Sequence, residues 1–355
     1  MINFSEQYLT LKNNRISGLH HLRGIMAILI MIYHYSSWIY GYFDSSTFLG
    51  RIGVYGVSIF YILSGLTLYW VYSEKLNVQT LKKYFVRRSL RIYPLLILVT
   101  LLTIFLLRDW EVYFSKARPA ATLILNLTGM FGFYAPERYI STGAWSIGNE
   151  LVFYSIFPLI IFLERWGQKL LYILFGISVL IGAYFAFFVI DETNSLSSNW
   201  KSYINPFNQF FLFFSGIVIV KLFGKTRKNN LIFGLILLFG LIGFIIYPVS
   251  GDRVNLVGGI NRFVFSVLSA SMVLSAYKLE YSFPRPFQVF LDKCGEMCYS
   301  IYLIHPLTFY TLNNYELFKN VGAGLNFAIC VSLTFGISLL VYTYIEKPFI
   351  NAFRK

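Results

Sequence analysis

The stretch HLRGIMAILIMIYH, residues 21–34, opens the first long apolar segment of the chain. It carries a cation, Arg23, near its start and an imidazole, His34, eleven positions further on. Eleven helical steps of about 100° return to nearly the same face, roughly 16 Å along the axis. Ionisable groups in a bilayer cost about 2.5 to 3.5 kcal/mol each at mid-helix and usually face a cavity or a partner. We therefore expect a reaction path along this helix.

The composition indicates a membrane protein. Of the 355 residues, 57% are hydrophobic, 19% aromatic and 13% charged, and the mean hydropathy is +0.61. A water-soluble domain could not bury so much apolar surface. The length allows about ten spans of some 20 residues and leaves no room for a sizeable soluble domain. We predict an all-α polytopic protein, with residues 1–355 forming one membrane domain and no appended soluble domain.

Ten apolar segments of suitable length follow one another, with no cleavable signal peptide expected before the first. The predicted spans are 19–40, 50–73, 91–108, 146–164, 170–190, 205–222, 230–248, 259–278, 297–314 and 324–345.

The basic residues give the orientation. Twenty-one of the 30 lysines and arginines fall in the terminal segments and alternate connections, which predicts that both termini are cytoplasmic. The net charge of +14 is thereby explained by topology rather than by nucleic-acid binding. The predicted inside set is Lys12, Arg15, Arg23, the cluster Lys75 to Arg91, Arg165, Lys169, Lys221 to Lys228, Lys278, Arg285, Lys293, Lys347, Arg354 and Lys355, and the outside set is Arg51, Arg108, Lys116, Arg118, Arg138, Lys201, Arg253, Arg262 and Lys319.

Two connections are expected to hold elements that do not span. Residues 120–133 are too apolar for a plain loop, and residues 280–296 carry two prolines beside an apolar pattern. The three cysteines, Cys294, Cys298 and Cys330, show no paired spacing, and we interpret them as small apolar filler. No metal site is expected.

The basic run KKYFVRRSLRIYP ahead of the third predicted span contains Arg88 and Arg91, three positions apart. On a helix they point the same way and could clamp a phosphate group bidentately. The alternative is that the run only sets topology and contacts anionic lipid. For Arg23 the alternative is likewise a topology anchor.

The segment TGAWSIGNELVFYSIFP opens the fourth predicted span with Trp145 and Ser146, and Glu150 follows about one turn further in. A carboxylate at that depth needs a partner or must become neutral. We expect Glu150 to orient and stabilise a protonated His34; the alternative is a pair with Arg138. Trp145 and Tyr154 have the character of interfacial aromatics, and Trp145 and Ser146 are candidate pocket residues.

Histidine suits proton transfer near neutral pH, so His34 is the candidate general base. The alternative is a histidine bonded to a hydroxyl of a neighbouring helix. The segment CYSIYLIHP carries Tyr302 and His305, followed by Pro306. His305 is either a structural histidine at a proline kink or, with Tyr302, part of the acceptor pocket. Glu346, in YIEKP, is interpreted as part of a helix terminus.

These motifs together resemble the acyltransferase-3 family of multi-pass membrane acyltransferases, which modify cell-surface glycans. The matching stretches, in order along nearly the whole chain, are LRGIMAILIMIYH, GVYGVSIFYILSGL, RRSLRIYP, WSIGNELVFY, CYSIYLIHP and YIEKP. The resemblance implies a ten-helix domain that uses cytosolic acyl-CoA. It assigns the family's helix-one arginine and histidine to Arg23 and His34, and its Arg-x-x-Arg to Arg88 and Arg91.

The chain departs from the family pattern in two places. The family's Asp-Gly-Leu-Arg setting is replaced by His20, His21, Leu22 and Arg23, so the acid's role is not carried over. We also expect no counterpart of the hydrolase-like domain that some relatives append to finish the transfer. We therefore expect direct delivery of the acyl group to the acceptor.

The expected function is acyl transfer, with acetyl preferred, from cytosolic acetyl-CoA or another acyl-CoA to a sugar hydroxyl of an envelope polysaccharide, such as O-antigen, or of its lipid-linked precursor. The expected location is the bacterial cytoplasmic membrane, with lipid as a further partner; self-association stays open. The rival interpretation is a proton-coupled transporter or exporter of a glycan or its precursor, because buried histidine and glutamate also build proton relays.

Overall fold

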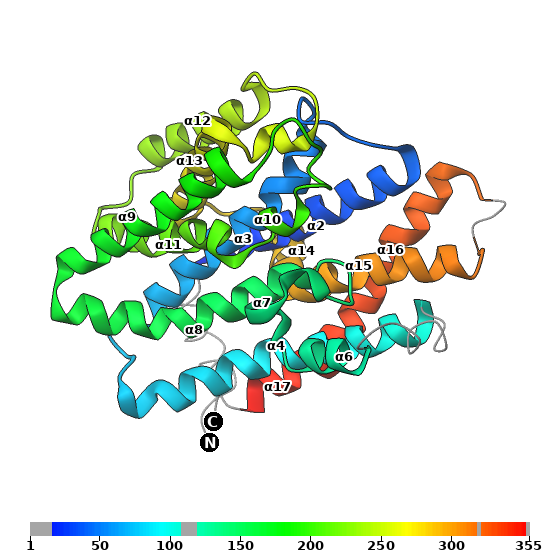
Figure 1. Cartoon of the computed structure of the whole chain (residues 1–355), viewed down its shortest axis with the longest axis horizontal. Coiled ribbons are helices and arrows are strands. Elements are labelled where there is room, and N and C mark those ends of the chain that lie inside the picture. The colour runs from blue at the N-terminus through cyan, green and yellow to red at the C-terminus, as the bar shows by residue number, and fades with distance from the viewer. Residues whose placement is uncertain (1–15, 108–118, 318–320, 353–355) are drawn as a thin grey trace.

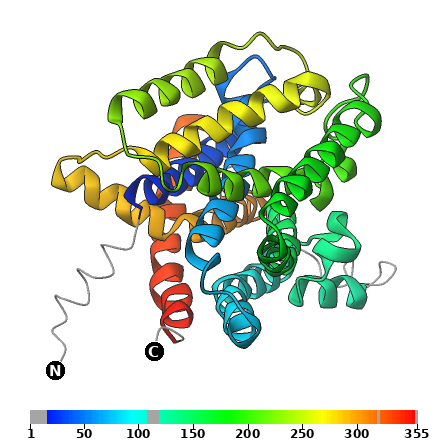
Figure 2. The same ribbon diagram turned by 90° about the vertical axis from the view of Figure 1, so that its left-hand side faces the viewer.

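The computed structural model describes residues 16–107, 119–317 and 321–352, and the regular structure in these ranges is entirely helical. The long helices lie side by side in one bundle (Figure 1). Helices α12 and α13 form one flank, and α4 and α17 form the opposite flank, in both Figure 1 and Figure 2.

The helices have the following bounds. The long helices are α2 (Ser17–Tyr40), α3 (Phe48–Tyr72), α4 (Val78–Leu107), α8 (Ala144–Trp166), α9 (Gln168–Tyr184), α11 (Pro206–Phe223), α12 (Asn230–Ile246), α13 (Gly259–Lys278), α15 (Cys298–Asn314) and α16 (Ala323–Val341). The shorter elements are α6 (Pro119–Leu127), α7 (Phe131–Tyr134), η1 (Pro136–Arg138), η2 (Phe185–Val189), α10 (Trp200–Tyr203), η3 (Arg253–Leu256), α14 (Arg285–Glu296), η4 (Tyr342–Glu346) and α17 (Lys347–Ala352).

The predicted fold class is confirmed. Every predicted span coincides with a helix, and in the described residues eight helices are long and apolar enough to cross a membrane. The other two predicted spans correspond to α12 and α15, which have 17 residues each. That the whole chain forms a single membrane domain stays a prediction.

The predicted start of the third span was wrong. Helix α4 begins at Val78 and runs for 30 residues, so the basic run lies inside the helix and not ahead of it. No glycine or proline interrupts residues 78–93, and Pro94 is accommodated within the helix. A proline removes one backbone hydrogen bond but does not end a helix that is held by its neighbours. Arg88 and Arg91 are thereby attached rigidly to a spanning helix.

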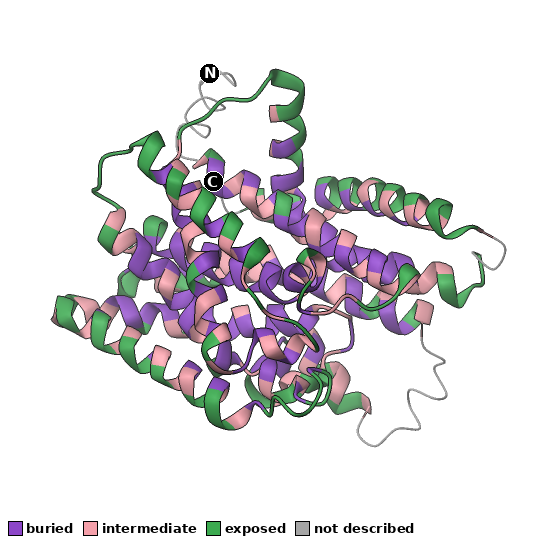
Figure 3. Ribbon diagram, turned by 90° about the horizontal axis from the view of Figure 1, so that it is seen from above, coloured by how far each residue is buried: buried purple, intermediate pink, exposed green. Residues whose placement is uncertain are grey.

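Helix α3 is the most deeply buried of the spans and forms the centre of the bundle. Its backbone approaches α11 closely, because a Cβ atom at Gly65 would collide with the carbonyl of Phe213, and one at Gly216 with the carbonyl of Ile62. Small residues allow such close packing of helices in membranes. Buried residues fill the middle of the bundle and exposed ones lie at its edge (Figure 3).

The connections predicted to lie inside meet at one end of the bundle. The Arg165 guanidinium donates to the carbonyl of Ser73 at 3.1 Å. Lys278 Nζ donates to the carbonyl of Thr226 at 3.0 Å. Lys228 pairs with Glu280 at 2.6 Å. We call this the inner end.

The connections predicted to lie outside meet at the opposite, outer end. The Ser45 amide donates to the carbonyl of Gly251 at 3.0 Å, and the Leu196 amide donates to the Asp252 carboxylate at 2.7 Å. This grouping is what alternating spans require. Which end faces the cytoplasm stays a prediction. The charges predicted at Lys12, Arg15, Arg108, Lys116, Arg118, Lys319, Arg354 and Lys355 lie outside the described residues.

Both elements predicted not to span are short helices. α6 has nine residues and α14 has twelve, about 14 and 18 Å long, so neither can cross a hydrocarbon core of about 30 Å. α14 packs against α2 at the inner end, which brings the segment before α15 close to the start of α2.

Candidate active site

A cavity opens among α2, α3, α4, α8 and α15, and its empty space of about 710 Å³ includes space open to solvent. The ionisable and hydroxyl side chains that line it come from all five helices. They are Arg23, Tyr61, Ser64, Thr67, Arg88, Arg91, Ser146, Glu150, Tyr154, Cys298, Tyr299 and Tyr302.

The three predicted arginines all line this cavity. A terminal nitrogen of Arg23 donates to Thr67 Oγ1 at 2.7 Å and reaches the carbonyl of Leu63 at 3.4 Å. Arg88 stacks over the Tyr72 ring at 5.5 Å, and its Nε is buried without a partner in the described residues. Arg91 lies one turn further along α4. Three guanidinium groups around one space form an anion-binding environment.

Glu150 is the carboxylate among these lining residues. Its Oε2 accepts a hydrogen bond from the Tyr154 hydroxyl at 3.0 Å, and that hydroxyl is also 2.9 Å from Ser64 Oγ. The charges of Arg91 and Arg23 act on it electrostatically. Glu150 therefore partly balances the arginines of the cavity.

The interpretation of Tyr154 as an interfacial aromatic was wrong. Its side chain is 6% exposed and lines the cavity, because Glu150 and Ser64 satisfy its hydroxyl. Its spacing of four positions from Glu150 is the signal that could have indicated this contact.

His34 is hydrogen-bonded to His305: His34 Nδ1 and His305 Nε2 are 2.9 Å apart. His305 Nδ1 is 2.9 Å from the carbonyl oxygen of Ile301, which can only accept, so Nδ1 carries the proton. In a neutral ring His305 Nε2 then accepts, and His34 Nδ1 donates. This leaves the lone pair on Nε2 of His34. His34 is half-buried and stacks on Trp38, whereas His305 is fully buried.

The expected contact between Glu150 and His34 needs correction. In the described part of the chain, Glu150 bonds to Tyr154 and His34 bonds to His305, and no hydrogen bond joins the two. The physical reason is the packing order: α15 packs along α2, whereas α8 packs mainly against α7, α9 and α11. Histidine, not glutamate, is therefore the neighbour of the candidate base.

Of the four candidate pocket residues of α8 and α15, Trp145, Ser146, Tyr302 and His305, only two line the cavity. Ser146 Oγ and the Tyr302 hydroxyl are 2.9 Å apart, and both residues line the cavity. The Tyr302 ring also lies 6.1 Å from the His305 ring, so it stands between the cavity and the histidine pair. Trp145 is not among the lining residues; it packs against Trp200 and Tyr203.

Two residues interpreted as structural lie at or near the cavity. Glu346 is 4% exposed, accepts a hydrogen bond from Ser300 Oγ, and interacts electrostatically with Arg91. Cys298, interpreted as filler, lines the cavity. The sequence signal for Glu346 is its acidity near the inner end of the last span, where a buried carboxylate needs a cationic partner.

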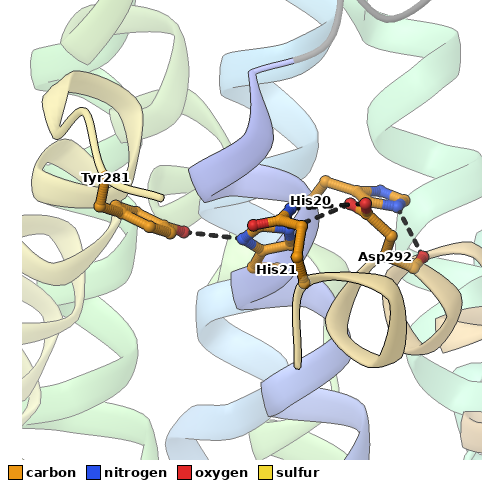
Figure 4. Close-up of polar contacts among 5 residues, drawn as sticks. His20, His21, Tyr281 and Asp292 are labelled. Carbon is orange, nitrogen blue, oxygen red and sulfur yellow. Dashed lines mark hydrogen bonds and ion pairs between the residues drawn. The ribbon is translucent and has the colours of Figure 1, made fainter. Parts of the chain in front are cut away.

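The substituted motif before Arg23 forms a polar junction between α2 and α14 (Figure 4). His21 contacts the Tyr281 hydroxyl at 2.9 Å and Asp292 Oδ1 at 3.1 Å, and His20 Nε2 donates to the Asp292 carbonyl at 2.9 Å. Burial raises the pKa of Tyr281 to about 12, so it stays protonated. The junction fixes the start of α2 directly before Arg23.

Comparisons with curated proteins find bacterial relatives of this chain. The chain is 26% identical over 290 residues to Nodulation protein 10 of Rhizobium leguminosarum bv. viciae, covering 72% of each chain. It is 25% identical over 232 residues to an uncharacterized protein of Haemophilus influenzae, covering 62% of this chain and 85% of that protein. It is 26% identical over 222 residues to an uncharacterized protein of Aquifex aeolicus, covering 60% and 89%. No solved structure matches the chain.

A family model described as an acyltransferase domain matches residues 16–343, nearly the whole described helical bundle. The match includes the cavity arginines, Glu150 and both members of the histidine pair. The chain therefore belongs to the acyltransferase-3 family.

Proposed function

We propose that this acyltransferase moves an acyl group, acetyl in preference to succinyl, from cytosolic acyl-CoA to a sugar hydroxyl of a bacterial envelope polysaccharide or of its lipid-linked precursor. The observation that carries the proposal is the convergence of Arg23, Arg88 and Arg91 on one cavity. Such a cavity suits a phosphorylated donor, because guanidinium groups bind phosphate oxygens through paired hydrogen bonds.

The donor would lie with its phosphates near Arg88 and Arg91 and its pantetheine arm beside Arg23. To reach the histidine pair the thioester must pass Tyr302, whose ring adjoins both the cavity and His305. Glu150 would hold the guanidinium groups in place through their mutual attraction.

The chemical step uses the free nitrogen of His34. Nε2 takes the proton from the sugar hydroxyl as its oxygen attacks the thioester carbonyl. The carbon–sulfur bond breaks, and the CoA thiolate leaves and receives that proton. The imidazolium that forms in between donates through Nδ1 to neutral His305, which takes the supporting role first assigned to Glu150.

The test uses cells that carry the protein and its glycan. His34→Ala should leave the amount of surface glycan unchanged and abolish its O-acyl ester, because only the transfer step is lost. Wild type and Lys82→Ala plus Lys83→Ala, which alters exposed residues of α4 away from the cavity, should keep the ester. Loss of the glycan itself in His34→Ala would contradict the proposal and favour export.

A further inference from the structure

An arginine at the outer end has no charge partner among residues 16–107, 119–317 and 321–352. Arg253 lies in η3, between α12 and α13, and its guanidinium carbon is 4.7 Å from the Tyr42 ring centre and 5.7 Å from that of Tyr33. Its Nε is buried without a hydrogen-bond partner in the described residues. Burial lowers the pKa of Arg253, and no carboxylate in the described part of the chain offsets this. A partly buried cation without a partner is costly to keep.

The neighbouring carboxylate, that of Asp252, already accepts hydrogen bonds from other groups. Asp252 Oδ2 accepts from the Tyr42 hydroxyl at 3.0 Å. Its Oδ1 accepts from the amides of Leu196 at 2.7 Å and Val254 at 2.8 Å. Asp252 therefore fixes the loop that carries Arg253, and the guanidinium is held in place before any ligand arrives.

Arg51, a second arginine at the outer end, has a structural role and serves as a comparison for Arg253. Arg51 is 2% exposed and donates to the carbonyls of Ser45, Phe244, Ile245 and Tyr247 at 2.7 to 2.9 Å. The N–H donors of Arg51 are therefore bonded to backbone carbonyls of the helix and loop. Arg253 has the opposite character: rings cover its faces, and the N–H edges of a stacked guanidinium stay able to donate.

The position of Arg253 connects it to the candidate base. The Tyr33 ring that contacts Arg253 lies 4.9 Å from the His34 ring. Trp38, one turn further out on α2, stacks on His34 at 5.0 Å. The Arg253 guanidinium is thus separated from the His34 ring by the single aromatic ring of Tyr33.

We propose that Arg253 binds an anionic group of the acceptor, the carboxylate of an acidic sugar or the phosphate of a lipid carrier, and so directs a sugar hydroxyl toward His34. This inference rests on the proposed acyl transfer. Arg253 acts as a binding and positioning residue, and the acceptor it selects is acidic.

The experiment measures binding of two acidic probes to the full-length protein in nanodiscs of zwitterionic lipid. One arm titrates tetragalacturonate against the neutral maltotetraose, and the other places polyprenyl phosphate or polyprenol in the bilayer. Wild type should bind the acidic member of at least one pair about tenfold more tightly than the neutral one. The arm that shows the preference identifies the source of the anion.

Variants show whether the preference for acidic probes comes from Arg253 itself or from the overall positive charge of the outer end. Arg253→Gln should lose the preference for acidic probes and keep the affinity for neutral probes. Arg253→Lys should keep part of the acidic preference, because lysine retains the positive charge but lacks the planar set of donors that binds an anion through two hydrogen bonds. Lys201→Gln removes an exposed positive charge at the same end and should leave the preference intact. Equal probe affinities in wild type and Arg253→Gln, or an equal loss in Lys201→Gln, would overturn the proposal.

Two further measurements distinguish a failure of this inference from a failure of folding or of the proposed function. Thermal unfolding of each variant shows whether a loss of binding is a loss of folding, and Arg253→Lys serves as the folded reference if Arg253→Gln is unstable. Acetyl-CoA binding is measured in the same samples. If wild type binds no acetyl-CoA, the proposed function fails; if it binds acetyl-CoA but Arg253→Gln keeps the acidic preference, only this inference fails.

Discussion

A histidine is a base only through the nitrogen that carries no proton, and His305 decides which nitrogen of His34 that is. The carbonyl of Ile301 fixes the proton on Nδ1 of His305, and this fixes the direction of the bond between the two rings. Tyr35 adds support, because its hydroxyl donates to the carbonyl of His305 at 2.8 Å. His305 therefore acts as a positioning residue for His34.

This arrangement predicts that a change at His305 lowers the rate of acyl transfer and leaves donor binding unchanged. His305→Ala removes the acceptor for His34 Nδ1 and should lower the rate of acyl transfer by about tenfold to a hundredfold. This is less than the roughly 10²- to 10⁴-fold that general-base catalysis supplies, because His305 acts only through His34. The affinity for acetyl-CoA should not change. His305→Gln offers an amide oxygen near the same position and should restore part of the rate. Equal rates in His305→Gln and His305→Ala would show that His305 only fills space.

Each member of this pair could be selected from the sequence as an ionisable residue in an apolar span, but their contact could not. His34 and His305 are 271 positions apart, and only the packing of α15 on α2 brings them together. The same limit explains why Glu150 was assigned to the wrong partner. Residue type predicted the candidates, and tertiary packing determined the pairs.

Among the elements, α4 shows most clearly how a helix carries function. It joins an exposed basic segment to an apolar span without a break, so Arg88 is held at a fixed distance from Arg91 and the bundle. Hydrophobic periodicity predicted the apolar part well. It missed the first thirteen residues, because charged residues are good helix formers but give no apolar signal.

Breaking α4 at one position tests this role. Ser89→Pro removes a backbone donor and clashes with the preceding turn, at a cost of about 3 kcal/mol in a helix interior. The acetyl-CoA affinity should fall by about tenfold or more, because Arg88 and Arg91 no longer share one rigid face. Val78→Pro, at the first position of the same helix, is the control, since proline is favourable there. Similar affinities in the two variants would contradict a rigid donor site.

On the scale of the whole molecule, the connections divide into two ends, and the positive charge of the sequence predicts that the inner end faces the cytoplasm. Fold class, helix positions and the alternation of connections were predictable from hydropathy and charge. The depth of the cavity and the course of α14 along α2 were not, because both depend on contacts between helices distant in sequence.

The assigned orientation can be measured with single cysteines in a variant without Cys294, Cys298 and Cys330. Lys201→Cys at the outer end should react with a membrane-impermeant thiol reagent in intact cells. Lys225→Cys at the inner end should react only after permeabilisation, because its connection is predicted to face the cytoplasm. Both positions are exposed, so accessibility does not differ for other reasons. The reverse pattern would invert the proposed donor and acceptor sides.

The central claim is that the arginine-lined cavity holds the acyl donor while His34 performs the transfer. Its most direct test is a titration of the purified protein in nanodiscs with acetyl-CoA. Wild type, His34→Ala and the exposed double variant Lys82→Ala plus Lys83→Ala should bind alike, and Arg88→Ala plus Arg91→Ala should bind at least about tenfold more weakly. Absence of binding in wild type, or equal affinity in all four proteins, would contradict the account.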